Sequence, residues 1–180
     1  MAGLDAPIAP ATAALVGVLL LTAIAAPAVA ATDTPVRLGG VDEPAAVGET
    51  ATVPVVVGEA EGGVGAYNLT VAVEDPDVAT VVDAEVAGDP GIRDVEVAPD
   101  GSYVTVRAAL MDTADAGEVT VATVTVAGEA AGETELTVAV ETLGDEAGRP
   151  YAVTAEEGSS LAVEDDTDST DGVAGTSGND

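Results

Sequence analysis

The sequence predicts an all-β domain built as a two-sheet sandwich, and three observations support this fold class. Valine-rich runs alternate with polar residues between Pro35 and Val163. Glycine, proline and aspartate separate these runs, so each run is typical of a short strand that ends in a turn. No segment beyond the N-terminal region repeats its apolar residues with the period of a helix. The span holds about nine such strands.

The first clear strand, Glu49–Val57, places Val53, Val55 and Val57 on one side. Pro54 lies inside this strand and has no N–H to donate to a neighbour. Its presence therefore favours either an edge position or a bulge.

The stretch from Val64 to Val86 contains two further strands joined by a turn at residues 75–77. One side of its first strand carries the apolar set Tyr67, Leu69, Val71 and Val73. The other side carries Asn68, Thr70 and Ala72. The second strand covers Val78–Val86. Alternation predicts that the first set faces the core and the second set faces outward.

The clearest hairpin turns at Pro99-Asp100-Gly101, residues that suit a tight turn. The strand that follows places on one face Val104, Val106, Ala108 and Leu110. Its opposite face carries Tyr103, Thr105 and Arg107. We therefore expect the first set to be buried and the second set to be exposed.

The last strands show one irregularity. In the strand over 118–128, Val119 and Val121 face one way, whereas Val124 and Val126 face the other. This parity break indicates a bulge or a strand covered on both sides. The next strand carries Leu136, Val138 and Val140, and the run from Tyr151 to Val163 closes the domain.

The two ends of the chain have a different composition. Residues 1–30 contain an apolar core followed by Ala28-Val29-Ala30, a small-x-small pattern that predicts a signal peptide cut after Ala30. An uncut N-terminal anchor is the alternative, because residues 6–32 carry no charge. Either reading predicts an extracellular or cell-surface location. Residues 164–180 are acidic and low in complexity, which predicts a disordered tail.

The charge of the chain bears on its partners and its surroundings. The chain carries 33 acidic residues against four basic ones, a formal charge of −29, and the four basic residues are all arginines. Nucleic acid is excluded as a partner because phosphate binding needs a basic surface. An acid excess on a folded domain favours a salt-rich environment, where screening weakens self-repulsion. The chain lacks cysteine and histidine, so it has neither disulfides nor the commonest metal ligand and general base.

Three segments, "VGETATVPVVV", "GVGAYNLTVAVEDPDVATVVDAEV" and "GEVTVATVTVAGEAAGETELTV", resemble cohesin domains. The resemblance covers most of residues 35–163. It implies a nine-stranded jelly-roll sandwich related in fold to carbohydrate-binding modules. It also implies a non-catalytic binding role, because cohesins typically hold dockerin modules on polysaccharide-degrading enzymes, and archaeal relatives occur in surface and secreted proteins.

The resemblance implies that the exposed side of the strand around Asn68 contributes to the partner-binding surface. The residues expected on this face are Asn68, Thr70, Ala72, Tyr103, Thr105 and Arg107. Asn68-Leu69-Thr70 is also an N-glycosylation sequon, so Asn68 is a candidate glycosylation site. A glycan there would obstruct the face, and the usual partner would then be replaced or bound elsewhere.

Other functions are weaker alternatives. Carbohydrate binding needs aromatic platforms, and the chain offers only Tyr67, Tyr103 and Tyr151. Clustered carboxylates could hold Ca²⁺, with Glu74, Asp75 and Asp77 as candidates and Asp112 and Asp115 as a second group, although solvated acidic turns are the simpler reading. No other cofactor is expected. Paired carboxylates alone do not indicate an enzyme, and a structural spacer of the cell envelope is a third possibility.

Overall fold

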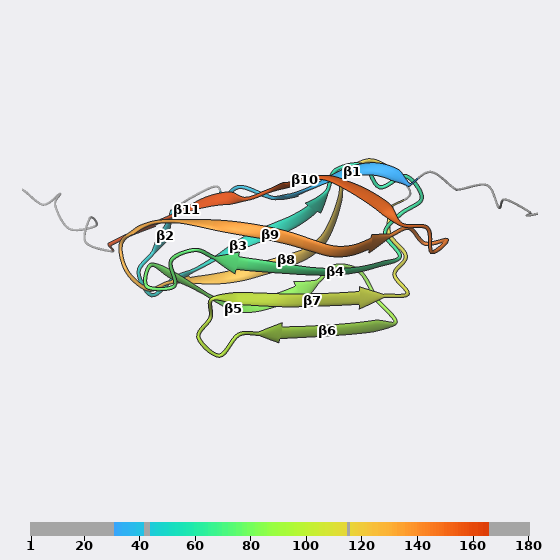
Figure 1. The fold of residues 1–180 in the computed structure, drawn as a ribbon. Helices are drawn as coiled ribbons and strands as arrows, with labels where there is room; N and C mark the ends of the chain where they lie inside the picture. The colour runs from blue at the N-terminus through green and yellow to red at the C-terminus, as the bar shows by residue number, and fades with distance from the viewer. Residues whose placement is uncertain (1–30, 42–43, 115, 166–180) are drawn as a thin grey trace, which may run out of the picture.

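The computed structural model describes residues 31–41, 44–114 and 116–165, and within these ranges the regular elements are all strands (Figure 1). The candidate signal segment, its expected cleavage position Ala30 and most of the predicted tail lie outside the described residues. Glu164, where the predicted tail begins, is instead the last residue of a strand. The described ranges contain no helix long and apolar enough to span a membrane.

Two sheets pack face to face. Sheet A has the order β10-β1-β3-β8-β5 and sheet B has the order β2-β11-β9-β4-β7-β6. The strands of sheet A are β1 (Thr32–Leu38), β3 (Thr50–Val57), β5 (Ala79–Val86), β8 (Val119–Gly128) and β10 (Tyr151–Glu157). Those of sheet B are β2 (Ala45–Ala46), β4 (Ala66–Val73), β6 (Ile92–Val97), β7 (Tyr103–Ala109), β9 (Gly132–Gly144) and β11 (Ser159–Glu164).

Most neighbouring strands are antiparallel, but β1 pairs with β10 and β11 pairs with β2 in parallel. Consecutive strands often lie in different sheets, so the chain crosses repeatedly between the layers. This arrangement agrees with the predicted jelly-roll sandwich.

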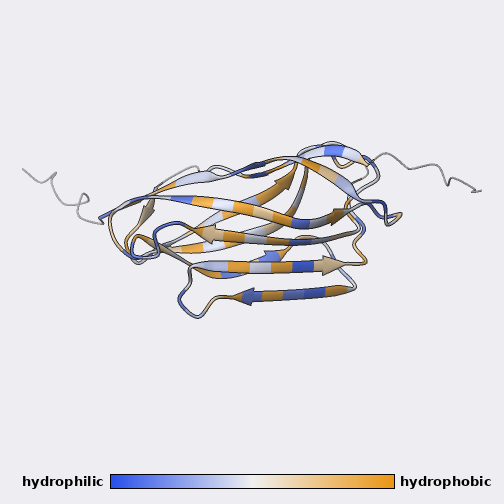
Figure 2. Ribbon diagram, viewed as in Figure 1, coloured by the Kyte–Doolittle hydropathy of each residue, from blue (hydrophilic) through white to orange (hydrophobic). Residues whose placement is uncertain are grey.

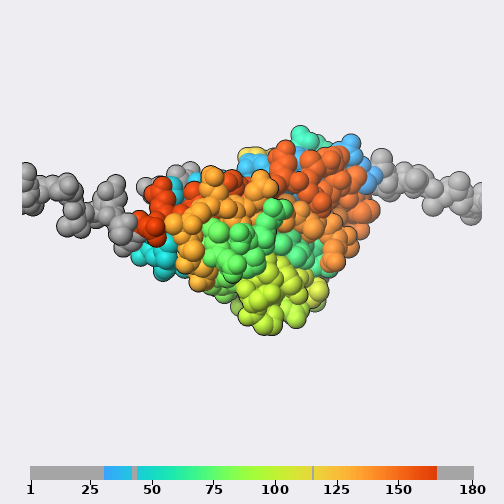
Figure 3. Space-filling model, turned by 60° about the vertical axis from the view of Figure 1, so that its left-hand side comes forward, coloured from blue at the N-terminus to red at the C-terminus, as the bar shows by residue number. Residues whose placement is uncertain are grey.

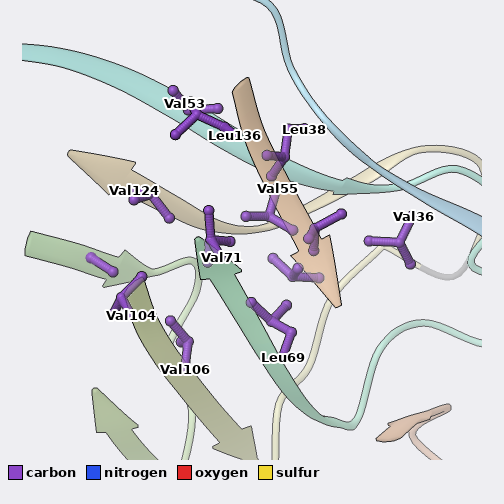
Figure 4. Packing of buried hydrophobic residues seen from close by; sticks show 14 of the residues in the cluster. Val36, Leu38, Val53, Val55, Leu69, Val71, Val104, Val106, Val124 and Leu136 are labelled. Atoms are coloured by element: carbon purple, nitrogen blue, oxygen red, sulfur yellow. The ribbon is translucent and has the colours of Figure 1, made fainter. Parts of the chain in front are cut away.

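The core between the sheets is made mainly of valine and leucine (Figure 4). Val53 and Val55 from sheet A face Leu69 and Val71 from sheet B, and all four are at most 1% exposed. Burying a valine or leucine side chain contributes roughly 1.5–3 kcal/mol, so many small contributions replace the large aromatic anchors that this chain lacks. Figure 2 shows the corresponding alternation of apolar and polar residues along the strands.

The structure has eleven strands rather than about nine. One addition is the two-residue strand β2. The other arises because the last run, predicted as one strand, divides at Gly158 into β10 in sheet A and β11 in sheet B. A Cβ on Gly158 would lie 2.4 Å from the Leu136 carbonyl oxygen, so the crossing passes too close to β9 for any side chain.

Pro54 does not lie on an edge strand, because β3 is between β1 and β8. Its neighbour β1 ends as a strand at Leu38, and only the Gly39 N–H reaches the Pro54 carbonyl, at 2.7 Å. Pro35 and Gly58 form the same arrangement at the other end of the β1–β3 ladder, at 2.8 Å. Each proline therefore occupies a position where the ladder ends and its missing N–H costs nothing.

The parity break in β8 is a bulge. Val55 pairs with Ala122 and Val56 pairs with Thr120, so Val121 has no opposite residue on β3. Val121 and Ala122 are both fully buried as a result. This extra residue allows Val119, Val121, Val124 and Val126 to face the core despite their mixed parity.

The β6–β7 hairpin forms at the predicted turn, where the Gly101 N–H donates to the Ala98 carbonyl at 2.9 Å. Asp100 accepts hydrogen bonds from the hydroxyl and the backbone N–H of Ser102, which lowers the pKa of its carboxyl group. The prediction that Leu110 faces the core is wrong. Leu110 has φ 57° and is 73% exposed, because the chain turns after Ala109 and buries Met111 instead.

Candidate partner-binding face

Six residues predicted to form a binding face do lie together on the outer surface of sheet B. In the antiparallel pair of β4 and β7, the register places Asn68 opposite Arg107, Thr70 opposite Thr105 and Ala72 opposite Tyr103. Residues opposite each other in a sheet share one face, and the alternate residues of both strands are buried. We call these six residues the β4–β7 face; their placement follows the predicted alternation, and their role remains a prediction.

Polar contacts connect the side chains of the β4–β7 face. The hydroxyls of Thr70 and Thr105 lie 3.3 Å apart, and the Arg107 guanidinium donates to Asp94 of β6 at 3.2 Å. Both partners of this ion pair are about half exposed or more, so the pair fixes the side chains more than it stabilises the fold. The face is therefore an ordered polar surface in the middle of a continuous sheet.

Asn68 lies near one end of this face, between β7 and β9. Its Nδ2 atom donates to the Glu141 carboxylate, whereas its Oδ1 atom is buried and accepts no hydrogen bond within the described part of the chain. Glycosylation at Asn68 would use the same nitrogen that contacts Glu141. The modification would replace one of the two hydrogens on this nitrogen beside Glu141, and it stays a prediction.

Sequence reasoning did not include Asp94 and Glu141 among the residues of this surface. Glu141 lies at an irregularity in the β4–β9 register, where Asn68 pairs with Thr142 and Leu69 pairs with Val140. Alternation along β9 gives Glu141 the same outward side as Ala139, but its position beside Asn68 depends on the pairing of β9 with β4 and on this bulge. Asp94 could have been found, because alternation in β6 places it opposite Arg107.

The three tyrosines have different roles. Tyr67 is 3% exposed, and its hydroxyl crosses the core to donate to the Val121 carbonyl at 2.8 Å. Burial raises the pKa of the Tyr67 hydroxyl above its usual value. The Tyr151 hydroxyl lies 2.8 Å from the carbonyl oxygens of both Glu61 and Gly63. Burial, together with nearby carboxylates, raises its pKa as well.

Tyr103 is consequently the exposed aromatic residue of the chain, at 44% exposure. One planar ring on a flat surface is a small platform for a sugar, since carbohydrate sites usually combine an aromatic face with several converging polar groups. The structure thus leaves a single aromatic contact for a glycan on the β4–β7 face.

The candidate calcium ligands lie around the turn between β4 and β5. Asp75 Oδ1 accepts the Asp77 N–H at 3.1 Å, and the Asp75 N–H donates to Thr134 at 3.0 Å. These contacts shape the turn. In the described ranges, no three acidic residues are placed so that they could share a metal ion. Asp112 is exposed, and Asp115 lies outside those ranges.

Comparison with known proteins identifies the fold. Neither the protein-family models nor the curated proteins contain a match to this sequence. Among solved structures, a chain of a type I cohesin–dockerin complex from Clostridium thermocellum is similar, with 16% identity, coverage of 73% of this chain and 95% of that one, and a TM-score of 0.56. A non-cellulosomal cohesin from the hyperthermophilic archaeon Archaeoglobus fulgidus has 20% identity, coverage of 73% and 91%, and a TM-score of 0.53.

A third similar structure is the cohesin module of a family 33 glycoside hydrolase from Clostridium perfringens, with 11% identity, coverage of 74% and 98%, and a TM-score of 0.55. This chain thus spans nearly the whole length of each of these modules. At such low identities the likeness establishes the fold and confirms the fold expected from the sequence.

Proposed function

Starting from the cohesin fold of this chain, we propose that it is a non-catalytic binding module that presents the β4–β7 face to a protein partner. The observation that supports this most directly is the register of β4 and β7, which gathers six predicted residues on one ordered polar surface. The similar Clostridium thermocellum structure is a cohesin–dockerin complex, so modules of this fold do bind protein partners. A dockerin-like protein or another secreted or surface protein is the proposed partner.

Export is part of the same proposal. The N-terminal segment resembles a signal peptide, and the strongly acidic composition fits a salt-rich surrounding. The Debye screening length of the solution falls to roughly 3 Å at about 1 M salt, which removes most of the repulsion among exposed carboxylates. A melting temperature that rises between about 0.1 and 3 M KCl supports this part. An unchanged melting temperature contradicts it.

The binding proposal is tested by affinity capture from the secreted proteins of the source, using two threonine variants. Thr105→Arg places a long cation in the middle of the β4–β7 face, whereas Thr52→Arg makes the same change on the outer surface of sheet A. We expect Thr105→Arg to lose the partner that wild type and Thr52→Arg retain. Equal capture by both variants would locate the partner elsewhere.

A carbohydrate is the second candidate ligand, and the exposed ring of Tyr103 is the observation that favours it. A glycan array at high salt separates the two candidates, with Tyr103→Ala as the matched variant. Binding that depends on Tyr103 supports a carbohydrate-binding module. The absence of binding in both the array and the capture experiment supports a structural spacer.

A further inference from the structure

Strand β6 is the outer edge of sheet B, and it is exposed along nearly its whole length. It pairs with β7 on one side, and no strand among the described residues pairs with its other side. Residues 92–96 are all exposed, although alternate residues of a sandwich strand are usually buried. In the space-filling view the yellow-green β6–β7 hairpin projects from the body of the domain (Figure 3). The backbone groups on this edge are therefore free to pair with an added strand.

Exposed apolar side chains occur at both ends of this edge. Five large hydrophobic residues of the described part are exposed, and one of them is Tyr103 on the β4–β7 face. The other four belong to β5, β6 or the end of β7: Val82, Ile92, Val95 and Leu110, with exposures of 47%, 60%, 37% and 73%. Ile92 and Leu110 lie together at one end of β6, since Ile92 pairs with Ala109, whereas Val82 lies near the turn at the other end.

Leu110 adds a second, independent observation. Its φ of 57° is in the left-handed region, where a residue with a Cβ costs about 1–2 kcal/mol relative to a right-handed conformation. Glycine would adopt the same turn without this cost. The leucine side chain lies over Gly91, where an added Cβ would be 3.0 Å from it, next to the start of β6. A strained and exposed leucine at this position indicates that its side chain serves a contact.

A groove runs between β6 and β5, the edge strand of sheet A. Its volume is about 640 Å³, and its walls are formed by residues 83–86 and 93–95. The apolar part of the lining is Ala84, Val86 and Val95. A strand added to β6 would point every second side chain toward this groove, because alternate residues of a sheet face the same side.

The charges along the edge of β6 determine which kind of strand can pair with it. A second copy of β6 related by a two-fold axis perpendicular to the sheet would pair antiparallel, and opposite residues then share a face. The registers that pair most of the strand place Asp94 opposite Asp94, or Asp94 opposite Glu96. Like charges directly opposite destabilise a sheet. The groove wall adds Asp83 and Glu85 against a single arginine, Arg93, so the net charge is negative; this edge disfavours copies of itself and favours a mainly cationic segment.

We propose that β6 accepts an extended segment of a partner protein that alternates basic and apolar residues, added as a seventh strand of sheet B. The segment places its basic side chains opposite Asp94 and Glu96 on the outer side. It places apolar side chains opposite Val95 and Val97, toward the groove, and it covers Ile92 and Leu110 at one end. Backbone hydrogen bonds supply affinity, and the alternation of side chains supplies specificity.

The complementary sequence can be written from β6. Read antiparallel from Val97 to Ile92, it is Val-Lys-Val-Lys-Glu-Val, in which the glutamate faces Arg93. This peptide, flanked by Gly-Ser and labelled with a fluorophore, is the probe, and its fluorescence anisotropy is measured against the full chain. We expect saturable binding at both about 0.2 M and about 2 M KCl, since backbone pairing and apolar burial persist when charges are screened.

Two peptide controls distinguish strand addition from non-specific electrostatic attraction between a basic peptide and this acidic protein. Val-Glu-Val-Glu-Lys-Val reverses the charges, and we expect it to bind about tenfold more weakly or worse, because three cross-strand pairs turn repulsive. A version methylated at alternate backbone nitrogens keeps all side chains but cannot donate to the edge, and we expect it to lose binding. Equal binding by the methylated peptide, or binding that vanishes at high salt, overturns the proposal.

Two protein variants test the site itself. Glu96→Lys reverses a charge on β6, whereas Glu133→Lys makes the same change at the distant start of β9. We expect Glu96→Lys to weaken the first peptide about fivefold or more, and Glu133→Lys to leave it unchanged. Leu110→Gly should also weaken the peptide while the domain stays folded by circular dichroism, because glycine fits the turn. Equal affinities for the two lysine variants contradict the proposed edge.

This inference does not depend on the β4–β7 face. The peptide experiments leave Thr105 and Tyr103 unchanged, and the capture experiment leaves Glu96 and Leu110 unchanged. Either result can therefore fail while the other stands.

Discussion

The two long sides of the sandwich are built from similar valine-rich strands but end in opposite ways. On one side, which we call the closed side, the chain passes from β10 in sheet A to β11 in sheet B and joins the layers. On the other, the open side, β5 and β6 end their sheets without a crossing strand. Figure 1 shows the crossing segment along the upper edge and β6 at the lower edge.

Hydrogen bonds reinforce the closed side. The Tyr151 hydroxyl contacts the 61–63 turn, and the Glu156 carboxylate accepts the Val140 N–H of β9 at 2.6 Å. Apolar residues here, such as Leu161, are fully buried. On the open side Val95 alternates with Asp94 and Glu96 and lies opposite the buried Val106, but it is 37% exposed. The difference shows that an alternating strand is buried only where a second layer lies over it.

The largest expected difference between the two sides concerns apolar truncation. Leu161→Ala on β11 should reduce the free energy of unfolding by about 2–5 kcal/mol, because it leaves a cavity between the sheets. Ile92→Ala on β6 should change that free energy by about 0.5 kcal/mol or less, because the side chain is already in water. Urea denaturation measures both values. Similar losses for the two variants would mean that the open side is covered.

The second expected effect concerns the crossing at Gly158. Gly158→Ala should cost about 1–3 kcal/mol of unfolding free energy, because its Cβ would lie 2.4 Å from the Leu136 carbonyl oxygen. Gly40→Ala is the matched control, since a Cβ there meets no atom within 4 Å. Thermal or urea unfolding should separate the two alanine variants. A harmless Gly158→Ala would show that β10 and β11 can cross farther from β9.

The third expected effect is a loss of stability in alkali. The pKa of Tyr67 is raised in the folded state, so the unfolded state loses its proton first as the pH rises above 10.0. The stability contributed by burying the neutral hydroxyl is complete below pH 10.0. Above it, this contribution falls by about 1.4 kcal/mol per pH unit, until the folded-state pKa is reached. Tyr151 adds a loss in the same direction.

Urea denaturation at pH values between about 9 and 11 measures this slope. Tyr67→Phe should make the alkaline slope shallower than that of the wild type. Identical slopes for the wild type and Tyr67→Phe would place Tyr67 in contact with water.

The smallest expected effect concerns the hydrogen bond that holds the closed side to the 61–63 turn. Tyr151→Phe should cost about 1 kcal/mol at neutral pH, because two nearby carbonyls lose their donor. Tyr103→Phe should stay within about 0.5 kcal/mol of wild type. Urea denaturation of both variants checks this, and a neutral Tyr151→Phe would mean that water replaces the hydroxyl.

Much of the candidate site could be predicted, because side chains along a strand alternate between the two faces of the sheet with a period of two residues. Alternation along β4 and β7 placed Asn68, Thr70 and Thr105 on the outer surface, and the register then brought them together. The outward side of Glu141 follows from the same alternation, but its contact with Asn68 was not predictable, because it depends on the pairing of β9 with β4 and on a bulge. Leu110 was misplaced for a related reason, since its left-handed backbone ends the strand before the alternation reaches it.

The sequence by itself determined the fold class, the outward side of each regular strand and the negative charge of the surface. These properties follow from local alternation, turn residues and composition, which need no knowledge of distant contacts. Only the tertiary structure decided that β10 and β11 close one side while β5 and β6 leave the other open. The physical reason is that burial depends on which strands lie across the core, and strand pairing joins residues far apart in the chain.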